Sequence, residues 1–143
     1  MIDNVVIDTN IFVSALLKAD TVPRQVLRTC LEGKVLPLMS NPLFTEYEGL
    51  LNRGRLFKNC PLTYEERDTF LNDFLSVCKW VNIYYLWRPN LRDEADNHLI
   101  ELAIAGNATC IVTGNIKDFQ NSELLFPHLK IYTAREFITE RSA

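Results

Sequence analysis

Short runs of apolar, often β-branched residues alternate along the chain with longer segments whose apolar residues recur at helical spacing. The short runs predict strands at residues 4–7, 35–39, 81–86, 109–113 and 130–132. The longer segments predict helices at residues 10–18, 23–31, 41–51, 63–78 and 93–105, and a last one that begins after Thr133. Such alternation is typical of right-handed βαβ units. We therefore expect one α/β domain over residues 1–143, a three-layer α/β/α sandwich around a mostly parallel sheet of four to five strands.

Local signals predict where several elements begin and end. Thr63-Tyr64-Glu65-Glu66 and Thr133-Ala134-Arg135-Glu136 have the spacing of capping boxes, in which the first and fourth residues bond each other's backbone N–H groups. Gly33 and Gly106 stand just past two predicted helices and are expected to terminate them. Pro37 lacks an N–H donor, so its strand should be short or lie near an edge of the sheet.

Composition indicates a soluble globular protein. The chain has 143 residues, of which 48% are hydrophobic and 23% charged. Its longest apolar run, residues 11–17, is interrupted by Ser14 and falls short of the ~20 residues that span a bilayer. Asp3 and Asp8 occupy the positions where a signal peptide would carry basic residues. We expect a cytoplasmic protein without membrane contact.

Cysteine spacing and net charge limit the chemistry. Cys30, Cys60, Cys78 and Cys110 form no CxxC pair, so free thiols in or near the core are expected rather than zinc ligands or disulfides. The net charge of −3 argues against nucleic-acid binding. That argument is weak, because a site built from carboxylates is acidic and obtains its positive charge from a metal ion.

Acids and amides gather where the predicted strands end. In parallel α/β sheets the ligand site lies outside the carboxyl ends of the strands. The polar residues placed there are Asp8 with Thr9 and Asn10, Glu46 in the helix that Ser40-Asn41-Pro42 begins, Asp93 and Asp96, and Thr113 with Asn115 and Asp118. Clustered carboxylates repel one another unless a cation neutralises them. Because every candidate ligand is an oxygen, Mg²⁺ or Mn²⁺ is favoured over zinc or copper.

Each of these residues has a structural alternative when it is taken alone. Asp8 could cap the following helix, and Glu46 could lie on a solvated helix face. Asp93 and Asp96 share one helix face and both complement the helix dipole. We take Asp96 as the ligand and Asp93 as the cap, although the reverse stays open. Asp118 could have only a local structural role, as a capping or turn residue.

The joint pattern is more specific than its parts. It combines Asp8-Thr9-Asn10 after the first strand, Glu46 six residues after Ser40, Asp-x-x-Asp-Asn-His from Asp93, and Thr-Gly-Asn-x-x-Asp-Phe from Thr113. On these residues the chain resembles the PIN-domain family, and within it the VapC-like toxins of prokaryotic toxin–antitoxin pairs. The resemblance extends over residues 5–14, 40–46, 93–103 and 111–119.

The resemblance implies roles for individual residues. Asp8, Glu46 and Asp96 match the three recurrent acidic positions of the family and would hold the metal. The fourth acidic position falls on Asn115. That substitution leaves one metal or two equally open, and Asp118 is expected to supply the missing carboxylate as a further metal ligand.

The implied reaction is hydrolysis of an RNA phosphodiester with Mg²⁺ or Mn²⁺. Two such ions ~4 Å apart would clamp the attacking and leaving oxygens. Thr9, Asn10 and Thr113 would position the phosphate or the ligands. The basic residues that could follow an RNA backbone or dock an antitoxin, or simply form a solvated face, are Arg53, Arg55, Lys58 and Lys117. The resemblance also implies an antitoxin partner and a homodimer, whose interface could use Phe12, Tyr84, Tyr85 or Trp87.

Three other readings compete with this one. A phosphatase of the haloacid-dehalogenase type needs a second Asp two residues after the first, and Asn10 stands there. A flap-type DNA nuclease needs more acids and DNA-gripping insertions than this chain has room for. A catalytically weak PIN scaffold that binds RNA or protein stays open because of Asn115.

Overall fold

The structure is a computed structural model that describes residues 2–18, 20–83, 97–119 and 126–142. In these ranges the strands are β1 (Asn4–Ile7), β2 (Leu36–Met39), β3 (Lys79–Trp80), β4 (Cys110–Val112) and β5 (Lys130–Tyr132). The α-helices are α1 (Thr9–Leu17), α2 (Val22–Leu31), α3 (Asn41–Leu51), α4 (Tyr64–Val77), α5 (Asn97–Ala105) and α7 (Ala134–Ser142). Two 3-10 helices, η1 (Gly54–Phe57) and η3 (Ile116–Phe119), complete the described elements.

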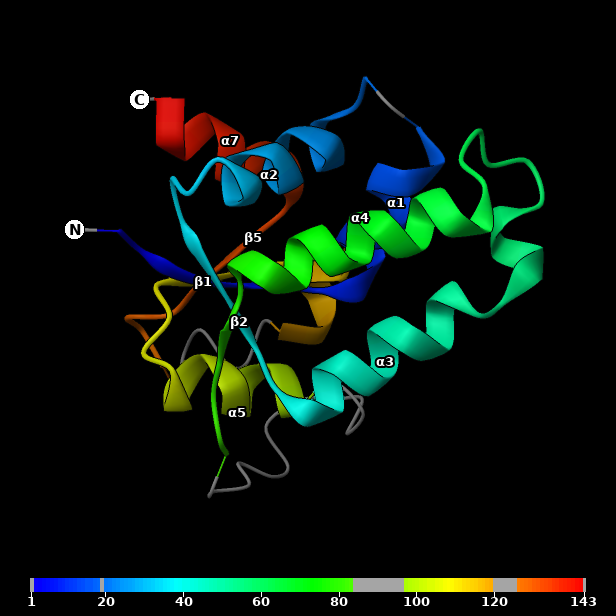
Figure 1. Ribbon diagram of the computed structural model, residues 1–143. Helices are drawn as coiled ribbons and strands as arrows, with labels where there is room; N and C mark the ends of the chain where they lie inside the picture. Colours follow the sequence, from blue (N-terminus) through cyan, green and yellow to red (C-terminus); the bar gives the residue numbers. More distant parts are fainter. Residues whose placement is uncertain (1, 19, 84–96, 120–125, 143) are drawn as a thin grey trace.

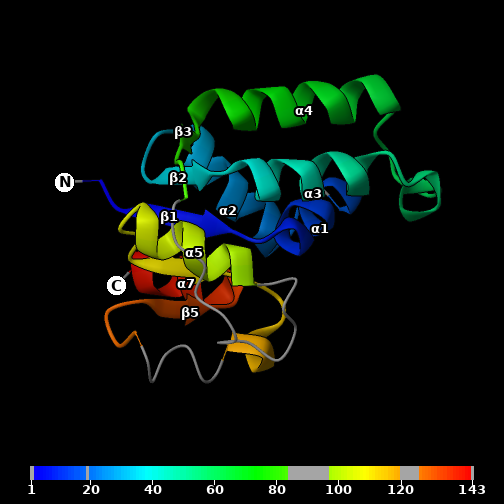
Figure 2. The ribbon, with the colours of Figure 1, turned by 90° about the horizontal axis from the view of Figure 1, so that it is seen from below.

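The five strands form one parallel sheet in the order β3-β2-β1-β4-β5. In Figure 1 the helices α2 and α7 lie above β1 and β5, and α5 lies below them. Viewed from below, α5 lies in front of the sheet, and α4 lies along α3 (Figure 2). The prediction of a three-layer α/β/α fold with a parallel sheet is therefore confirmed.

Strand β1 is the centre of the sheet. Val5 pairs with Pro37 of β2 on one side and with Cys110 of β4 on the other. Because helices cover both faces, Val5, Val6 and Ile7 are all buried, as the uninterrupted apolar run predicts. The chain order runs outward from β1 to β3 and then returns to β4, so the order reverses between β1 and β4.

Pro37 occupies a strand that is short but not at an edge, because β2 lies between β1 and β3. The N–H of Leu36 donates to the carbonyl of Asp3, on the β1 side. The Pro37 nitrogen therefore faces the β3 side, where pairing begins one residue later, at Leu38 with Lys79. The sheet thus avoids the hydrogen bond that proline cannot make.

The strand expected at residues 81–86 is wrong in position. The structure places β3 at Lys79–Trp80, and residues 81–83 are not strand. Helix α4 ends at Val77, with Cys78 already extended, so the chain enters the sheet at once. Val81 still donates its N–H to the Met39 carbonyl, but β2 ends there and offers no further partner. Residues 84–86 lie outside the described residues.

Most predicted helix signals are confirmed. Both capping boxes are present, with reciprocal bonds between Thr63 and Glu66 and between Thr133 and Glu136. Gly33 ends α2 with a φ of 77°. At the end of α5 the prediction fails by one residue, because the left-handed position is Asn107, with a φ of 56°, and not Gly106. The start expected for this helix at Asp93 lies outside the described residues.

Gly106 allows the end of α5 to pack closely against Leu38 and Val81. A Cβ atom at this position would lie 2.4 Å from Cδ1 of Leu38 and 3.3 Å from Cγ2 of Val81. The side-chain amide of Asn4 also donates to the Gly106 carbonyl at 2.9 Å. Glycine is needed here because the end of α5 passes directly against β2.

An aromatic cluster fills the layer between the sheet, α1, α3 and α4. Phe12 is fully buried and packs edge-on against Tyr47 and Phe70, with ring centroids 5.2 and 5.9 Å apart. Phe74 tilts against both Phe12 and Tyr47. The suggestion that Phe12 serves a dimer interface is therefore wrong, and the other three candidates lie outside the described residues.

Two further observations concern the whole described chain. Cys30, Cys60, Cys78 and Cys110 are free thiols, buried or half-buried, as their spacing predicts. Among the described helices none combines the length and the apolar character needed to cross a membrane.

Gly106→Ala should destabilise the fold by ~1–3 kcal/mol, because the added methyl overpacks a buried leucine. Gly49→Ala is the matched control. Gly49 is exposed within α3 and a Cβ there meets nothing within 4 Å, so this change should stabilise by ~0.5–1 kcal/mol. Urea unfolding of both variants measures the difference. Equal stabilities would show that the α5–β2 contact is not tight.

Candidate functional site

The candidate site lies where the strand order reverses, at the carboxyl ends of β1 and β4. The backbone N–H of Asp8 donates to the Val112 carbonyl at 2.9 Å, and that of Thr113 donates to the Tyr132 carbonyl at 2.9 Å. The ladder thus continues one residue beyond β1 and β4. Asp8 and Thr113 are therefore held side by side by the sheet itself, at the position where open α/β sheets bind ligands.

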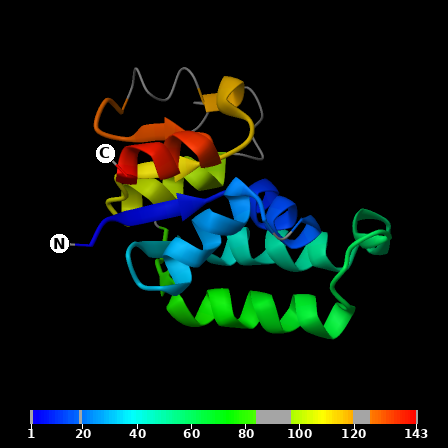
Figure 3. The same cartoon turned by 90° about the horizontal axis from the view of Figure 1, so that it is seen from above.

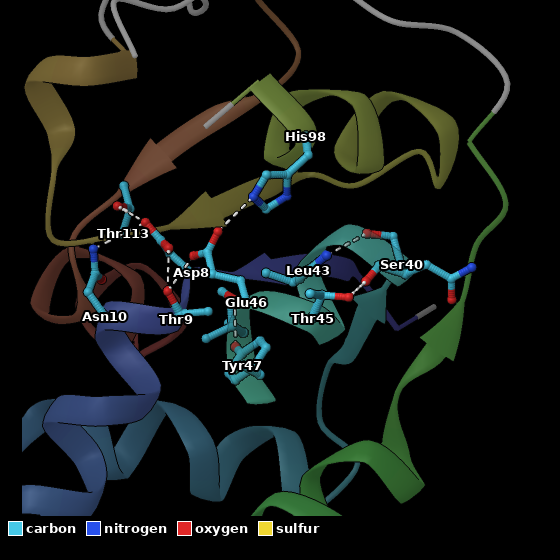
Figure 4. Close-up of polar contacts among 12 residues, drawn as sticks. Asp8, Thr9, Asn10, Ser40, Leu43, Thr45, Glu46, Tyr47, His98 and Thr113 are labelled. Carbon is cyan, nitrogen blue, oxygen red and sulfur yellow. Dashed lines mark hydrogen bonds and ion pairs between the residues drawn. The ribbon is translucent and has the colours of Figure 1, made fainter. Parts of the chain in front are cut away.

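Asp8 is a buried carboxylate with several donors around it (Figure 4). Its residue surface is only 3% exposed. Oδ2 accepts hydrogen bonds from Thr113 Oγ1 at 2.7 Å and from Asn10 Nδ2 at 3.1 Å. The side chain makes no capping bond to α1. Asp8 thus occupies the N-cap position of α1, but its carboxylate is bound by Thr113 and Asn10 and not by a capping bond.

Thr9 and Asn10 connect Asp8 to its neighbours. Thr9 Oγ1 donates to Glu46 Oε1 at 2.6 Å and lies 3.4 Å from Asp8 Oδ1. Asn10 Oδ1 accepts the backbone N–H of Gly114 at 3.0 Å, across the β1–β4 junction. A Cβ at Gly114 would approach the Asn10 amide at 3.5 Å. The start of α1 therefore joins the two strand ends and the acid on α3.

Helix α3 carries Glu46 to the site. The helix begins at Ser40, whose Oγ accepts the backbone N–H of Leu43. Tyr47, fully buried, donates its hydroxyl to the Ile7 carbonyl at 2.7 Å, which anchors the helix to the end of β1. Glu46 precedes this anchor and is only partly exposed. Its side chain is 32% exposed, and Thr9 and His98 bind its two carboxylate oxygens, so Glu46 is more than part of a solvated helix face.

His98 on α5 is the second partner of Glu46. Its Nε2 lies 2.9 Å from Glu46 Oε2, and the imidazole is largely buried (Figure 4). The sequence interpretation placed His98 in a motif but gave it no role. A signal was present, because His98 and Glu101 are polar residues three apart on an otherwise apolar helix.

Opposite electrostatic conditions act on the two acids. Burial raises the pKa of Asp8, the Thr113 hydrogen bond lowers it, and the charge of Glu46 raises it further. The hydrogen bond with His98 lowers the pKa of Glu46, against a smaller effect of burial. Glu46 is therefore ionised readily, whereas the charge of Asp8 needs compensation that its neutral donors supply only in part.

The remaining predicted residues are placed differently. Asn115 is exposed, and its backbone N–H donates to Thr113 Oγ1 at 3.0 Å. Asp118 belongs to η3, but its side chain lies outside the described part of the structure. Asp93 and Asp96 also lie outside the described residues. Of the predicted site, the structure thus brings together Asp8, Thr9, Asn10, Glu46 and Thr113.

Glu101 is, after His98, a second residue to which the sequence analysis gave no role. It is 3% exposed and lines a cavity of about 330 Å³ with Ser40 and Asn41, on the side of α3 where that helix begins. Its position three residues after His98 places both on the face of α5 that is turned toward α3. A buried polar residue in an apolar helix was the available signal.

The described part of the chain offers the oxygen ligands that a hard divalent cation prefers, but too few of them to hold it. Asp8 and Glu46 supply carboxylate oxygens, which Mg²⁺ and Mn²⁺ prefer. Within residues 2–18, 20–83, 97–119 and 126–142, no group of three His, Cys, Asp or Glu side chains could hold a metal ion. The two further carboxylates that the sequence analysis expects as ligands, on residues 96 and 118, lie outside this part.

Comparison with known proteins identifies the family. The chain matches the PIN domain over residues 4–117. It is 32% identical to the uncharacterized protein MJ1680 of Methanocaldococcus jannaschii, over 95% of this chain and 90% of that protein. The chain therefore belongs to the PIN-domain family.

A solved structure shares the fold. It is a chain of the crystal structure of VapBC2 from Rickettsia felis bound to a DNA fragment from their promoter. The TM-score is 0.60 at 20% identity, with 91% of this chain and 98% of that chain covered. The predicted PIN-like architecture is confirmed by this likeness.

Asp8→Asn should stabilise the protein at pH 7 without metal, by ~0.5–2 kcal/mol. The raised pKa means that ionising Asp8 disfavours the folded state. This penalty is absent below the unfolded pKa of ~3.9, grows as pH rises from there to the raised folded pKa, and is constant above it. Urea unfolding in EDTA should therefore show a gap at pH 7 that closes near pH 4.

Asp68→Asn, on the exposed face of α4, is the control for that measurement and should change stability by less than ~0.5 kcal/mol at either pH. An Asp8→Asn protein that is less stable than wild type at pH 7 would contradict the electrostatic account of the site.

Proposed function

We propose that this protein is a metal-dependent endoribonuclease that hydrolyses RNA phosphodiester bonds. The observation that carries the proposal is the Asp8 carboxylate, buried at the strand-order reversal and held by Thr113 and Asn10 beside Glu46. A structural carboxylate in such a place would be costly, whereas a metal ligand must be there before the ion arrives. Membership of the PIN-domain family, whose members are generally nucleases, supports the same assignment.

The proposed metal is Mg²⁺ or Mn²⁺, held by Asp8, Glu46, Asp96 and Asp118. Bound there, the ion would neutralise the phosphate and lower the pKa of water for attack on phosphorus. The chain's own contribution is placement. Thr113 and Asn10 fix the plane of the Asp8 carboxylate through Oδ2. Asn115 is proposed as a neutral ligand or an orienter of water.

Thr9 would keep the two acids at a constant separation. Its hydroxyl donates to Glu46 and lies beside Asp8, so one side chain spans both. His98 positions the other Glu46 oxygen from the opposite side. With both carboxylates fixed before substrate binds, little reorganisation is needed in the transition state, which is the main source of rate in phosphoryl transfer.

The biological setting proposed is a toxin–antitoxin pair in the cytoplasm, with this chain as the toxin, as a homodimer inhibited by an antitoxin protein. The shared fold with a chain of the VapBC2 structure supports it. Lys117 is exposed beside the site and is suited to RNA backbone contact. Exposed Arg53 and Arg55 near η1 are suited to the same role or to the antitoxin.

Purified wild-type protein should cleave RNA with Mn²⁺ and not with EDTA, and Asp8→Asn and Asp96→Asn should each lower the rate ~10²-fold or more. Removal of one ligand charge weakens the metal and the field on the phosphate. The measurement is cleavage of a mixed structured RNA, followed on denaturing gels, with Asp68→Asn as the control of unchanged rate.

Urea unfolding of Asp8→Asn, expected to show a stability at least equal to that of the wild type, separates loss of activity from unfolding. Metal-dependent RNA binding without cleavage by a folded, antitoxin-free wild type would favour the catalytically weak scaffold. Cleavage that survives both substitutions would place the chemistry elsewhere.

Mn²⁺ should raise the thermal stability of the wild type and of Asp68→Asn, but far less that of Asp8→Asn. A ligand at 100 times its Kd stabilises the folded state by ~2.7 kcal/mol. Differential scanning fluorimetry across a Mn²⁺ titration measures this, and an equal rise in all three proteins would exclude Asp8 as a ligand.

A further inference from the structure

A cavity of about 720 Å³ opens next to Asp8, on the side away from Glu46 and His98. Asn10 and Thr113 line it, and these are the two residues whose side chains hold Asp8 Oδ2. The cavity therefore shares two residues with the proposed metal site. Its size falls within the ~300–1,000 Å³ range of small-molecule sites.

The cavity lies between three helix starts. Helix α1 supplies Ile11 and Ser14, α2 supplies Val22 and Pro23, and α7 supplies Ala134 with its neighbours. Figure 3 shows α2 and α7 side by side above the sheet, with α1 continuing from β1. The aliphatic part of the wall is made of Ile11, Val22, Pro23 and Ala134, and the other lining residues include Asp20, Thr21 and Thr133.

Three of the polar side chains that line the cavity make no hydrogen bond to the described part of the chain. Ser14, Gln25 and Asn115 all line it, and none of their side chains bonds to a residue that the structure describes. Together they offer a hydroxyl and two amides, each able to donate and accept. Amide and hydroxyl groups against an apolar wall are the equipment that reads the edge of an unstacked base.

Arg135 supplies positive charge at the rim. It lies in the first turn of α7, is exposed, and forms no ion pair or hydrogen bond through its side chain with any described residue. A cation in the first turn opposes the helix dipole. Among the described residues that line the cavity Arg135 is the one cation and Asp20 the one carboxylate, so the guanidinium is the group that a phosphate at the rim would contact.

We propose that this cavity is the subsite for the nucleotide next to the scissile phosphate, with its base against the aliphatic wall and its phosphate at Arg135. The proposal rests on the proposed ribonuclease function and makes the cavity the determinant of cleavage preference. Ser14, Gln25 and Asn115 would select the base, while Asp8 and the metal act on the adjoining phosphodiester.

The test separates binding from cleavage. The four ribonucleoside 5′-monophosphates are titrated into ¹⁵N-labelled full-length protein in EDTA, and amide shifts are followed by NMR. We expect shifts at Ser14, Gly114 and Arg135, with one base bound tighter than the others. Ser14→Trp fills the cavity and should abolish them, whereas Ser76→Trp, on an exposed face of α4, should not.

A second pair of variants covers a failure of Ser14→Trp to fold. Arg135→Gln should weaken mononucleotide binding roughly tenfold, the size of a lost charge-assisted hydrogen bond. Arg28→Gln makes the same charge change on the exposed face of α2, outside the cavity, and should leave binding unchanged.

Cleavage-site mapping on random-sequence RNA completes the design. Loss of nucleotide preference beside the cut in Ser14→Trp, with Ser76→Trp like wild type, supports the subsite. Mononucleotide binding in the cavity by a protein that cuts no RNA would show a nucleotide-binding cavity, and would overturn both the nuclease function and the role of the cavity in cleavage preference. Metal-dependent cleavage with wild-type preference in Ser14→Trp, or no amide shifts in the cavity, would overturn the subsite and leave the nuclease function intact.

Discussion

The site depends on one buried interaction, the pair of hydrogen bonds that hold Asp8 Oδ2 between Thr113 and Asn10. Thr113 follows β4 and Asn10 lies in the first turn of α1, so the carboxylate joins the two strands between which the order reverses. Neutral donors orient the carboxylate without neutralising it, and burial keeps its pKa raised. This leaves a preorganised carboxylate whose charge favours the arrival of a cation.

Helix α3 brings a second acid, Glu46, close to Asp8 and keeps its carboxylate bound to protein groups. Ser40 starts the helix at the end of β2, and the Tyr47 hydroxyl bonds the Ile7 carbonyl one residue before Asp8. The two contacts fix the height and rotation of the helix. The Glu46 side chain points toward Thr9 and His98, and each of these residues binds one of its carboxylate oxygens.

The cavity beside Asp8 makes the two sides of its carboxylate chemically different. One side of the carboxylate faces Glu46 on α3, and the other faces a cavity whose lining combines aliphatic residues, amides and hydroxyls with Asp20 and Arg135. A phosphodiester needs charge neutralisation at phosphorus and a neutral, shaped surface for its base. The same strand ends can provide both because Asn10 and Thr113 belong to both sides.

The sequence by itself determined the strands β1, β4 and β5, the helix starts at Ser40, Thr63 and Thr133, and the family, because these follow from local spacing and capping chemistry. Even its errors were local in origin. Residues 81–83 carry an apolar pattern, but β2 ends at Met39 and offers them no further strand to pair with. Gly106 is explained by its close packing against Leu38 and not by a left-handed helix end. Only the tertiary structure decided that Glu46 is bound rather than solvated, that His98 and Glu101 face α3, and that a cavity adjoins Asp8. The physical reason is that these facts depend on contacts between residues tens of positions apart, which no local pattern encodes.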